Sequence, residues 1–145
     1  MKANELRIGN YVTWKDEESN DAILTVTGIV LNDCVWVEWE WEDGEKDYTD
    51  CDFDGLKPIP ITEDWLIRFG FEVGKGSTVW ANKKELNYIS SNEYQIFKNE
   101  ISIADFKFVY LNDNLISEIN YVHSLQNLYF SLTGEELETK KSPEK

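Results

Sequence analysis

Apolar and acidic residues alternate through residues 35–42, whose sequence is Val-Trp-Val-Glu-Trp-Glu-Trp-Glu. Because successive side chains of a β-strand point to opposite faces, this segment is predicted to be a strand with two unlike faces. The core face would consist of Val35, Val37, Trp39 and Trp41, and the solvent face of Trp36, Glu38, Glu40 and Glu42. An exposed indole among carboxylates is either a contact site or is covered by another part of the chain. We therefore take Trp36, Glu38 and Glu40 as candidate binding residues.

Short strand patterns and turn signals continue on both sides of this segment, and Pro58 and Pro60 close the series. The predicted strands are Leu6–Ile8, Tyr11–Trp14, Ile23–Leu31, Cys34–Trp41 and Lys46–Phe53. Asp43-Gly44 is a favourable hairpin dipeptide between the last two. Five short strands in so few residues predict a small SH3-like β-barrel over residues 1–60.

A helix is predicted directly after the prolines. Thr62 offers an N-cap hydroxyl, Glu63 and Asp64 suit the first turn, and Gly70 follows Phe69 where a C-cap glycine belongs. An antiparallel meander should follow, with strands at Phe71–Val73, Thr78–Trp80, Tyr94–Phe97, Lys107–Leu111 and Leu115–Asn120. The expected class is α+β, with the barrel packed on a meander that two helices flank.

The second helix is expected from about Asn120 to Thr133, so the helix–meander–helix part covers residues 61–137 and leaves a disordered tail at 138–145. Its core face gathers Tyr121, Val122, Leu125, Leu128, Tyr129 and Leu132. The opposite face gathers His123, Gln126, Asn127 and Phe130. Phe130 there implies either packing against the N-terminal barrel or contact with a partner. On the second alternative, His123, Asn127 and Phe130 are candidate binding residues.

The net charge of −14 at pH 7 argues against general nucleic-acid binding and against attraction to anionic membranes. Residues 1–60 hold 15 acidic and 5 basic side chains, so most of the excess lies there. The start of the sequence has no apolar run after its charge, and about 18 consecutive apolar residues occur nowhere. We expect a protein of the cytosol, in which Cys34 and Cys51 remain free thiols.

The sequence contains only incomplete versions of known metal-binding and phosphate-binding motifs. Residues 50–55 imitate the opening of an EF-hand loop, but Ile61 stands where the loop needs a bidentate Glu. Gly74-Lys75 imitates the end of a phosphate loop, but Gly76 stands where the loop needs Ser or Thr, and Phe69 stands where it needs its first glycine. His123 is the single histidine. We therefore expect no metal site, no cofactor and no enzymatic activity.

Three segments together resemble a known family: residues 1–10 (MKANELRIGN), residues 58–71 (PIPITEDWL followed by FGF), and residues 121–137 (YVHSLQNLYFSLTGEEL). The family comprises short uncharacterised proteins of phages, prophages and mobile elements of the Bacteroides group. The resemblance runs through nearly the whole chain in order and is weakest in residues 38–54 and in the meander. The resemblance implies an origin in a phage or mobile element, but it assigns no catalytic residue to this chain.

In that context we expect a small non-enzymatic binding protein that inhibits or sequesters a host component, such as a counter-defence protein. Its partner would be a host protein or a small nucleotide signal. Two alternatives remain: a self-associating structural or regulatory module of the mobile element, and a nucleotide-cleaving enzyme that uses His123. Should the aromatic residues prove irrelevant, Lys75, Lys83 and Lys84 offer a surface for an anionic nucleotide. The apolar connection at residues 58–61 predicts that the two halves share a packed interface.

Overall fold

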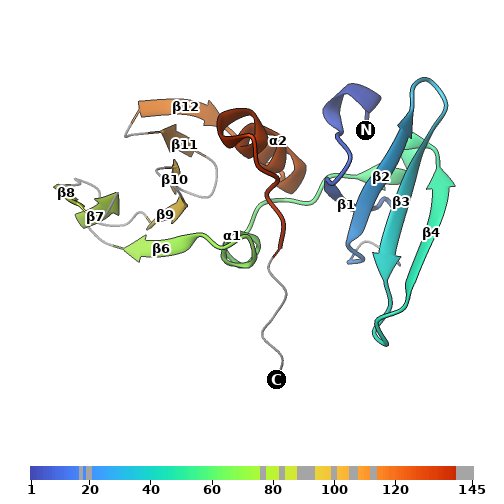
Figure 1. The fold of residues 1–145 in the computed structure, drawn as a ribbon, viewed down its shortest axis with the longest axis horizontal. Coiled ribbons are helices and arrows are strands. Elements are labelled where there is room, and N and C mark those ends of the chain that lie inside the picture. Colours follow the sequence, from blue (N-terminus) through green and yellow to red (C-terminus); the bar gives the residue numbers. More distant parts are fainter. Residues whose placement is uncertain are drawn as a thin grey trace. The chain divides into compact units, whose positions relative to one another are not determined.

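The computed structural model describes residues 1–16, 18, 21–75, 78–81, 84–87, 94–98, 101–104, 108–111 and 114–139. The protein is α+β, with mostly antiparallel sheets and two α-helices among these residues. The chain divides into two compact units, shown in Figure 1. Unit 1 combines Met1–Pro60 with Tyr121–Leu137, and unit 2 combines Ile61–Asn120 with Glu138–Lys145. This division differs from the predicted one, which placed the last helix with the meander.

Unit 1 contains a curled, half-barrel sheet in the order β4-β3-β2-β1-β5, with antiparallel neighbours throughout. Its strands are β1 (Tyr11–Trp14), β2 (Leu24–Val30), β3 (Cys34–Glu40), β4 (Lys46–Cys51) and β5 (Leu56–Lys57). Two short 3₁₀ helices, η1 (Ala3–Glu5) and η2 (Phe53–Gly55), precede β1 and β5. Four of the five predicted strands are therefore present.

The predicted strand at Leu6–Ile8 is wrong. Its backbone enters a tight turn, in which Asn10 Oδ1 accepts a hydrogen bond from the Arg7 N–H at 2.7 Å and the Asn10 N–H returns one to Arg7 O at 3.1 Å. Gly9 adopts a φ of +100°, which glycine tolerates far better than other residues. A side chain that satisfies the local backbone in this way competes with strand pairing.

The core of unit 1 confirms the alternation in β3, since Val35 and Val37 are fully buried. They pack with apolar residues from the other strands, namely Leu6, Val12, Leu24, Val26 and Leu56. Trp39 is only partly buried, and Trp41 is 55% exposed, contrary to the prediction that it belongs to the core. Trp41 lies beyond the end of β3, where the chain has already begun to turn.

In unit 2, α1 (Glu63–Arg68) confirms the predicted helix and both of its caps. The Thr62 hydroxyl accepts a hydrogen bond from the Trp65 N–H at 3.3 Å. Gly70, with a φ of +92°, lets the chain leave the helix. The apolar residues of this segment are buried: Trp65, Leu66, Phe69 and Phe71.

The sheet of unit 2 has the order β12-β11-β10-β9-β6, and β7 and β8 pair separately as a hairpin. The strands are β6 (Glu72–Lys75), β7 (Thr78–Ala81), β8 (Lys84–Asn87), β9 (Tyr94–Lys98), β10 (Ile101–Ala104), β11 (Phe108–Leu111) and β12 (Asn114–Glu118). The antiparallel meander was predicted, but β8 and β10 were not. All four residues of β10 are buried, so it lacks the alternation that reveals a half-exposed strand. Lys83, which belongs to the predicted lysine surface, and most of the predicted tail, residues 140–145, lie outside the described residues.

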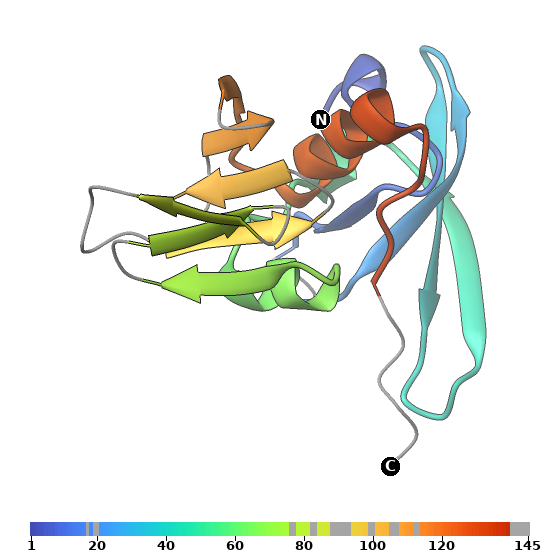
Figure 2. The ribbon, with the colours of Figure 1, turned by 60° about the vertical axis from the view of Figure 1, so that its left-hand side comes forward.

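The second helix, α2 (Val122–Thr133), packs against β1 within unit 1 (Figure 2). It ends at Gly134, as predicted, with a left-handed φ of +76°. The N-cap position is held by Tyr121 instead of Asn120. The Val122 N–H donates to Ile59 O at 2.8 Å, so the start of the helix is held by backbone pairing. In the part of the chain that the structure describes, neither helix is long and apolar enough to cross a membrane.

Candidate interaction surface

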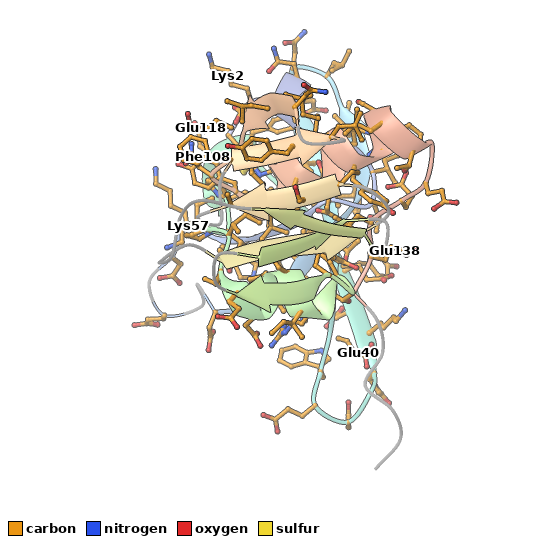
Figure 3. All side chains as sticks on the ribbon, turned by 90° about the vertical axis from the view of Figure 1, so that its left-hand side faces the viewer. Lys2, Glu40, Lys57, Phe108, Glu118 and Glu138 are labelled. Carbon is orange, nitrogen blue, oxygen red and sulfur yellow. The ribbon has the colours of Figure 1, made fainter. Side chains whose placement is uncertain are left out.

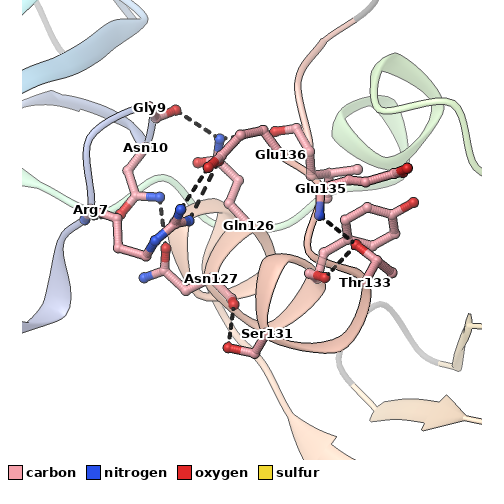
Figure 4. A network of polar contacts seen from close by, with 11 residues as sticks. Arg7, Gly9, Asn10, Gln126, Asn127, Ser131, Thr133, Glu135 and Glu136 are labelled. Atoms are coloured by element: carbon pink, nitrogen blue, oxygen red, sulfur yellow. Dashed lines mark hydrogen bonds and ion pairs between the residues drawn. The ribbon is translucent and has the colours of Figure 1, made fainter.

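Gln126 is fully enclosed where α2 meets the first turn of the chain, and all its polar atoms are used (Figure 4). Its Oε1 accepts the Tyr11 N–H at 2.8 Å. Its Nε2 donates to Gly9 O at 3.0 Å and to Leu137 O at 3.1 Å. A buried amide that bonds to three backbone groups fixes the helix on the sheet, because buried polar groups in proteins are almost always hydrogen-bonded.

Asn127 also bonds to the N-terminal segment. Its Oδ1 accepts a hydrogen bond from Asn10 Nδ2 at 2.8 Å, and its Nδ2 donates to Glu5 O at 3.1 Å. One turn further along α2, the guanidinium carbon of Arg7 lies 3.9 Å from the centroid of the Phe130 ring. Of the two alternatives that the sequence left open for Phe130, the structure shows packing within unit 1.

His123 is buried and stacks on Tyr121, with ring centroids 5.9 Å apart and ring planes 11° from parallel. Burial lowers the pKa of His123, while the charge of Glu5 acts in the opposite direction. The Nδ1 atom has no hydrogen-bond partner among the described residues. Asn127 and Phe130 thus contact the N-terminal segment, whereas the printed ring contact of His123 is with Tyr121, the N-cap residue of the same helix.

The other candidate residues lie on the opposite side of the sheet from the core, on the β3–β4 hairpin. Two backbone hydrogen bonds close the turn between β3 and β4. The Trp41 N–H donates to Glu45 O at 2.7 Å, and the Gly44 N–H donates to Trp41 O at 2.9 Å. With Gly44 at a φ of +88°, this is a three-residue loop with a bulge. The resulting register pairs Trp36 with Asp50.

Four side chains on the outer face of this hairpin form what we call the aromatic–acidic block: Trp36, Glu38, Tyr48 and Asp50. Trp36 lies opposite Asp50, and Glu38 lies opposite Tyr48. The two aromatic rings therefore occupy one diagonal of the block and the two carboxylates the other. The ring centroids are 6.2 Å apart, and the ring planes are tilted by 41°.

The aromatic rings of the block are accessible, with Tyr48 69% and Trp36 37% exposed. Trp36 is the more enclosed because it packs on Gly28 of β2: a Cβ added there would lie 3.4 Å from the Trp36 Cβ. The glycine thus leaves room for the indole to rest against the sheet. Tyr48 and Asp50 were not among the predicted site residues.

Glu40, the third predicted residue of this face, lies at the hairpin end of β3 (Figure 3). It pairs across the sheet with Lys46. The Lys46 ammonium lies 3.7 Å from a carboxylate oxygen of Glu38, so Lys46 leans toward the block. Residues 33–54 contain ten acidic side chains and this one basic side chain.

The charge of the hairpin also affects Cys51, which faces the core side. Burial, followed by the charges of Asp52 and Asp50, raises the pKa of its thiol. A raised pKa keeps the thiol protonated and unreactive at neutral pH. No group of three or more potential metal ligands occurs in the described ranges. Of the residues that imitate an EF-hand loop, Asp50 lies in β4, and Asp52 is the N-cap residue of η2.

The outer edge of β4 is partly closed by its own side chains. The Tyr48 N–H donates to Asp47 Oδ1 at 3.0 Å, and the Thr49 hydroxyl donates to Asp50 O at 3.2 Å. Such local bonds and the flanking carboxylates discourage the addition of another strand.

Comparison of the chain with protein-family models, with curated proteins and with solved structures gives no match.

Proposed function

We propose that this is a non-enzymatic binding protein of phage or mobile-element origin, which inhibits or sequesters a host protein through the outer face of its β3–β4 hairpin. Unit 1 is, in this proposal, an SH3-like barrel: the strand order β4-β3-β2-β1-β5 and the 3₁₀ helix before β5 support that assignment. The barrel holds the binding residues on paired strands, where their positions vary little.

The observation that carries the proposal is the aromatic pair of the block. Trp36 and Tyr48 remain exposed although Val35 and Val37, the adjacent residues on the other side of β3, are fully buried. The outer face is therefore not needed to complete the core of unit 1. Trp and Tyr are enriched among residues that dominate binding energy, because each combines a large apolar area with a polar group.

The charge of the face favours a basic protein surface over the other partners. Ten acidic side chains in residues 33–54 repel the phosphates of a nucleotide signal. They also oppose self-association through this face, because two copies would bring like charges together. A basic host protein would be both attracted to the face and held by its aromatic rings.

The test is capture from a host lysate by the full-length chain and by matched variants. Tyr48→Thr keeps a residue that suits a strand, and Trp36→Ala removes the indole; each should weaken capture of a specific host protein by about tenfold, corresponding to about 1.4 kcal/mol. Ile67→Ala, which truncates an exposed apolar residue of α1, is the control and should capture as well as the parent. Equal capture by all variants would exclude this face as the contact surface.

A further inference from the structure

We propose that the partner presents an arginine side chain to the aromatic–acidic block, an inference that rests on the proposed function. The block offers two kinds of attraction to one cation. The Trp36 and Tyr48 rings are tilted and 6.2 Å apart, so neither ring covers the other as a parallel stack would. A cation within about 6 Å of a ring centroid is attracted by the negative face of the ring. The carboxylates on the other diagonal supply the second attraction, between opposite charges.

The carboxylates of the block differ in their existing partners. Glu38 already lies 3.7 Å from the ammonium of Lys46. Asp50 makes no ion pair with any described residue. An incoming cation would therefore occupy the side of the block formed by Asp50 and Trp36, which are opposite each other in the register. Lys46 shows that this face holds a basic side chain in the free protein.

The chemistry of this position favours arginine over lysine. A guanidinium is planar, so it can stack on an indole or phenol ring while its edge donates two parallel hydrogen bonds to one carboxylate. An ammonium is a compact, strongly hydrated charge that cannot do both in the same way. The indole of Trp36, which is supported from behind by Gly28, provides a fixed stacking surface.

The experiment uses the complete ¹⁵N-labelled protein and three peptides: acetyl-Gly-Arg-Gly-amide, its lysine counterpart, and its citrulline counterpart, which has the shape of arginine without the charge. Six tryptophans give six indole N–H signals in an NMR titration. The arginine peptide should shift the Trp36 signal to saturation, with an affinity about two- to fivefold above that of the lysine peptide. The citrulline peptide should leave the signal unchanged.

Two variants with equal change in net charge separate the block from the general acidity of the hairpin. Asp50→Asn should weaken binding of the arginine peptide by about two- to fivefold. Glu42→Gln, in the hairpin turn beside the exposed Trp41, should not. Equal affinities for arginine and lysine, equal effects of the two variants, or equal shifts at Trp36 and Trp41 would each overturn the inference.

The outcomes also distinguish this inference from the proposed function. If a host protein is captured in a manner that requires Trp36 and Tyr48, but the arginine peptide shows no preference, the arginine inference fails and the binding function stands. If the arginine peptide binds the block as expected, but capture does not depend on Trp36 or Tyr48, the proposed function fails in its present form.

Discussion

The guanidinium of Arg7 lies over the ring of Phe130, 3.9 Å from the ring centroid, and so joins the first turn of the chain to its last helix. The same guanidinium bonds to Glu136 at 2.6 Å. A residue near the start of unit 1 thus touches both α2 and the segment that follows it. These contacts explain why the helix belongs to unit 1.

Replacing Arg7 should therefore loosen α2. We expect Arg7→Ala to lower the free energy of unfolding by about 1–2 kcal/mol, since it removes a cation–π contact and a partly exposed ion pair. Urea denaturation would measure the change. A double-mutant cycle with Phe130→Ala should give a coupling energy of about 0.5–1 kcal/mol; additive effects would show that the ring and the guanidinium do not interact.

Replacing Gln126 should destabilise the protein clearly more than replacing an exposed polar residue of the same helix. Gln126→Leu fills a similar volume but removes the partners of three backbone groups, and we expect a loss of about 2–4 kcal/mol in the free energy of unfolding. The control is Ser131→Ala, which removes an exposed hydrogen bond from the Ser131 hydroxyl to Asn127 O. It should change the free energy of unfolding by less than about 0.5 kcal/mol. If both variants lost similar amounts of unfolding free energy, the hydrogen bonds of Gln126 would not stabilise the protein as we propose.

Stability should fall on mild acidification because of His123. Its pKa is lowered in the folded protein, chiefly by burial. As the pH falls through the ordinary histidine pKa of about 6.5, the unfolded chain takes up a proton that the folded protein resists, so the folded state loses stability until its own lower pKa is reached. The melting temperature of His123→Phe should decline less than that of the parent between about pH 7.5 and pH 5.5. Parallel curves would show that His123 does not contribute.

The segment after α2 should contribute more to stability than its position near the end of the chain implies. Leu137 is fully buried, and we expect Leu137→Ala to cost about 2–4 kcal/mol. Leu132 is 37% exposed, so Leu132→Ala should cost clearly less. Chemical denaturation of the two variants provides the comparison, and equal losses would mean that residues 135–137 do not pack as described.

Local signals were sufficient to predict most of the individual elements. Thr62 and Gly70 marked the ends of α1, and Gly134 marked the end of α2, because these residues satisfy or release the backbone within one turn. The alternation of Val35 and Val37 identified the core face of β3. Each of these predictions depends on residues that are close together in the sequence.

The composition of the block was harder to predict because it depends on register. A two-residue turn at Asp43-Gly44 would pair Glu42 with Glu45, whereas the three-residue loop pairs Glu40 with Lys46. A shift of one residue moves every side chain of β4 to the other face. The glycine in the third loop position was the available signal for the longer turn, and it would have placed Tyr48 and Asp50 beside Trp36.

The position of α2 was not predictable from its own sequence. Gln126 and Asn127 lie with Phe130 on the face opposite its apolar stripe, for which the sequence left open packing against the N-terminal barrel or contact with a partner, without naming the groups involved. In the structure they bond to groups of Glu5, Gly9, Asn10 and Tyr11, more than 110 residues earlier in the chain. No local pattern identifies partners at such a separation.

The two ends of the segment Ile61–Asn120, which forms most of unit 2, meet. The Ile61 N–H donates to Asn120 O at 3.1 Å, and Pro60 and Tyr121 form a β-bridge at the adjoining position of unit 1. Residues 61–120 therefore leave and re-enter unit 1 at one point, so a short reverse turn would be long enough to rejoin Pro60 to Tyr121. This arrangement makes residues 61–120 an exchangeable cassette: another domain with adjacent termini could be grafted at the same junction without altering the strand order of the sheet that bears Trp36 and Tyr48.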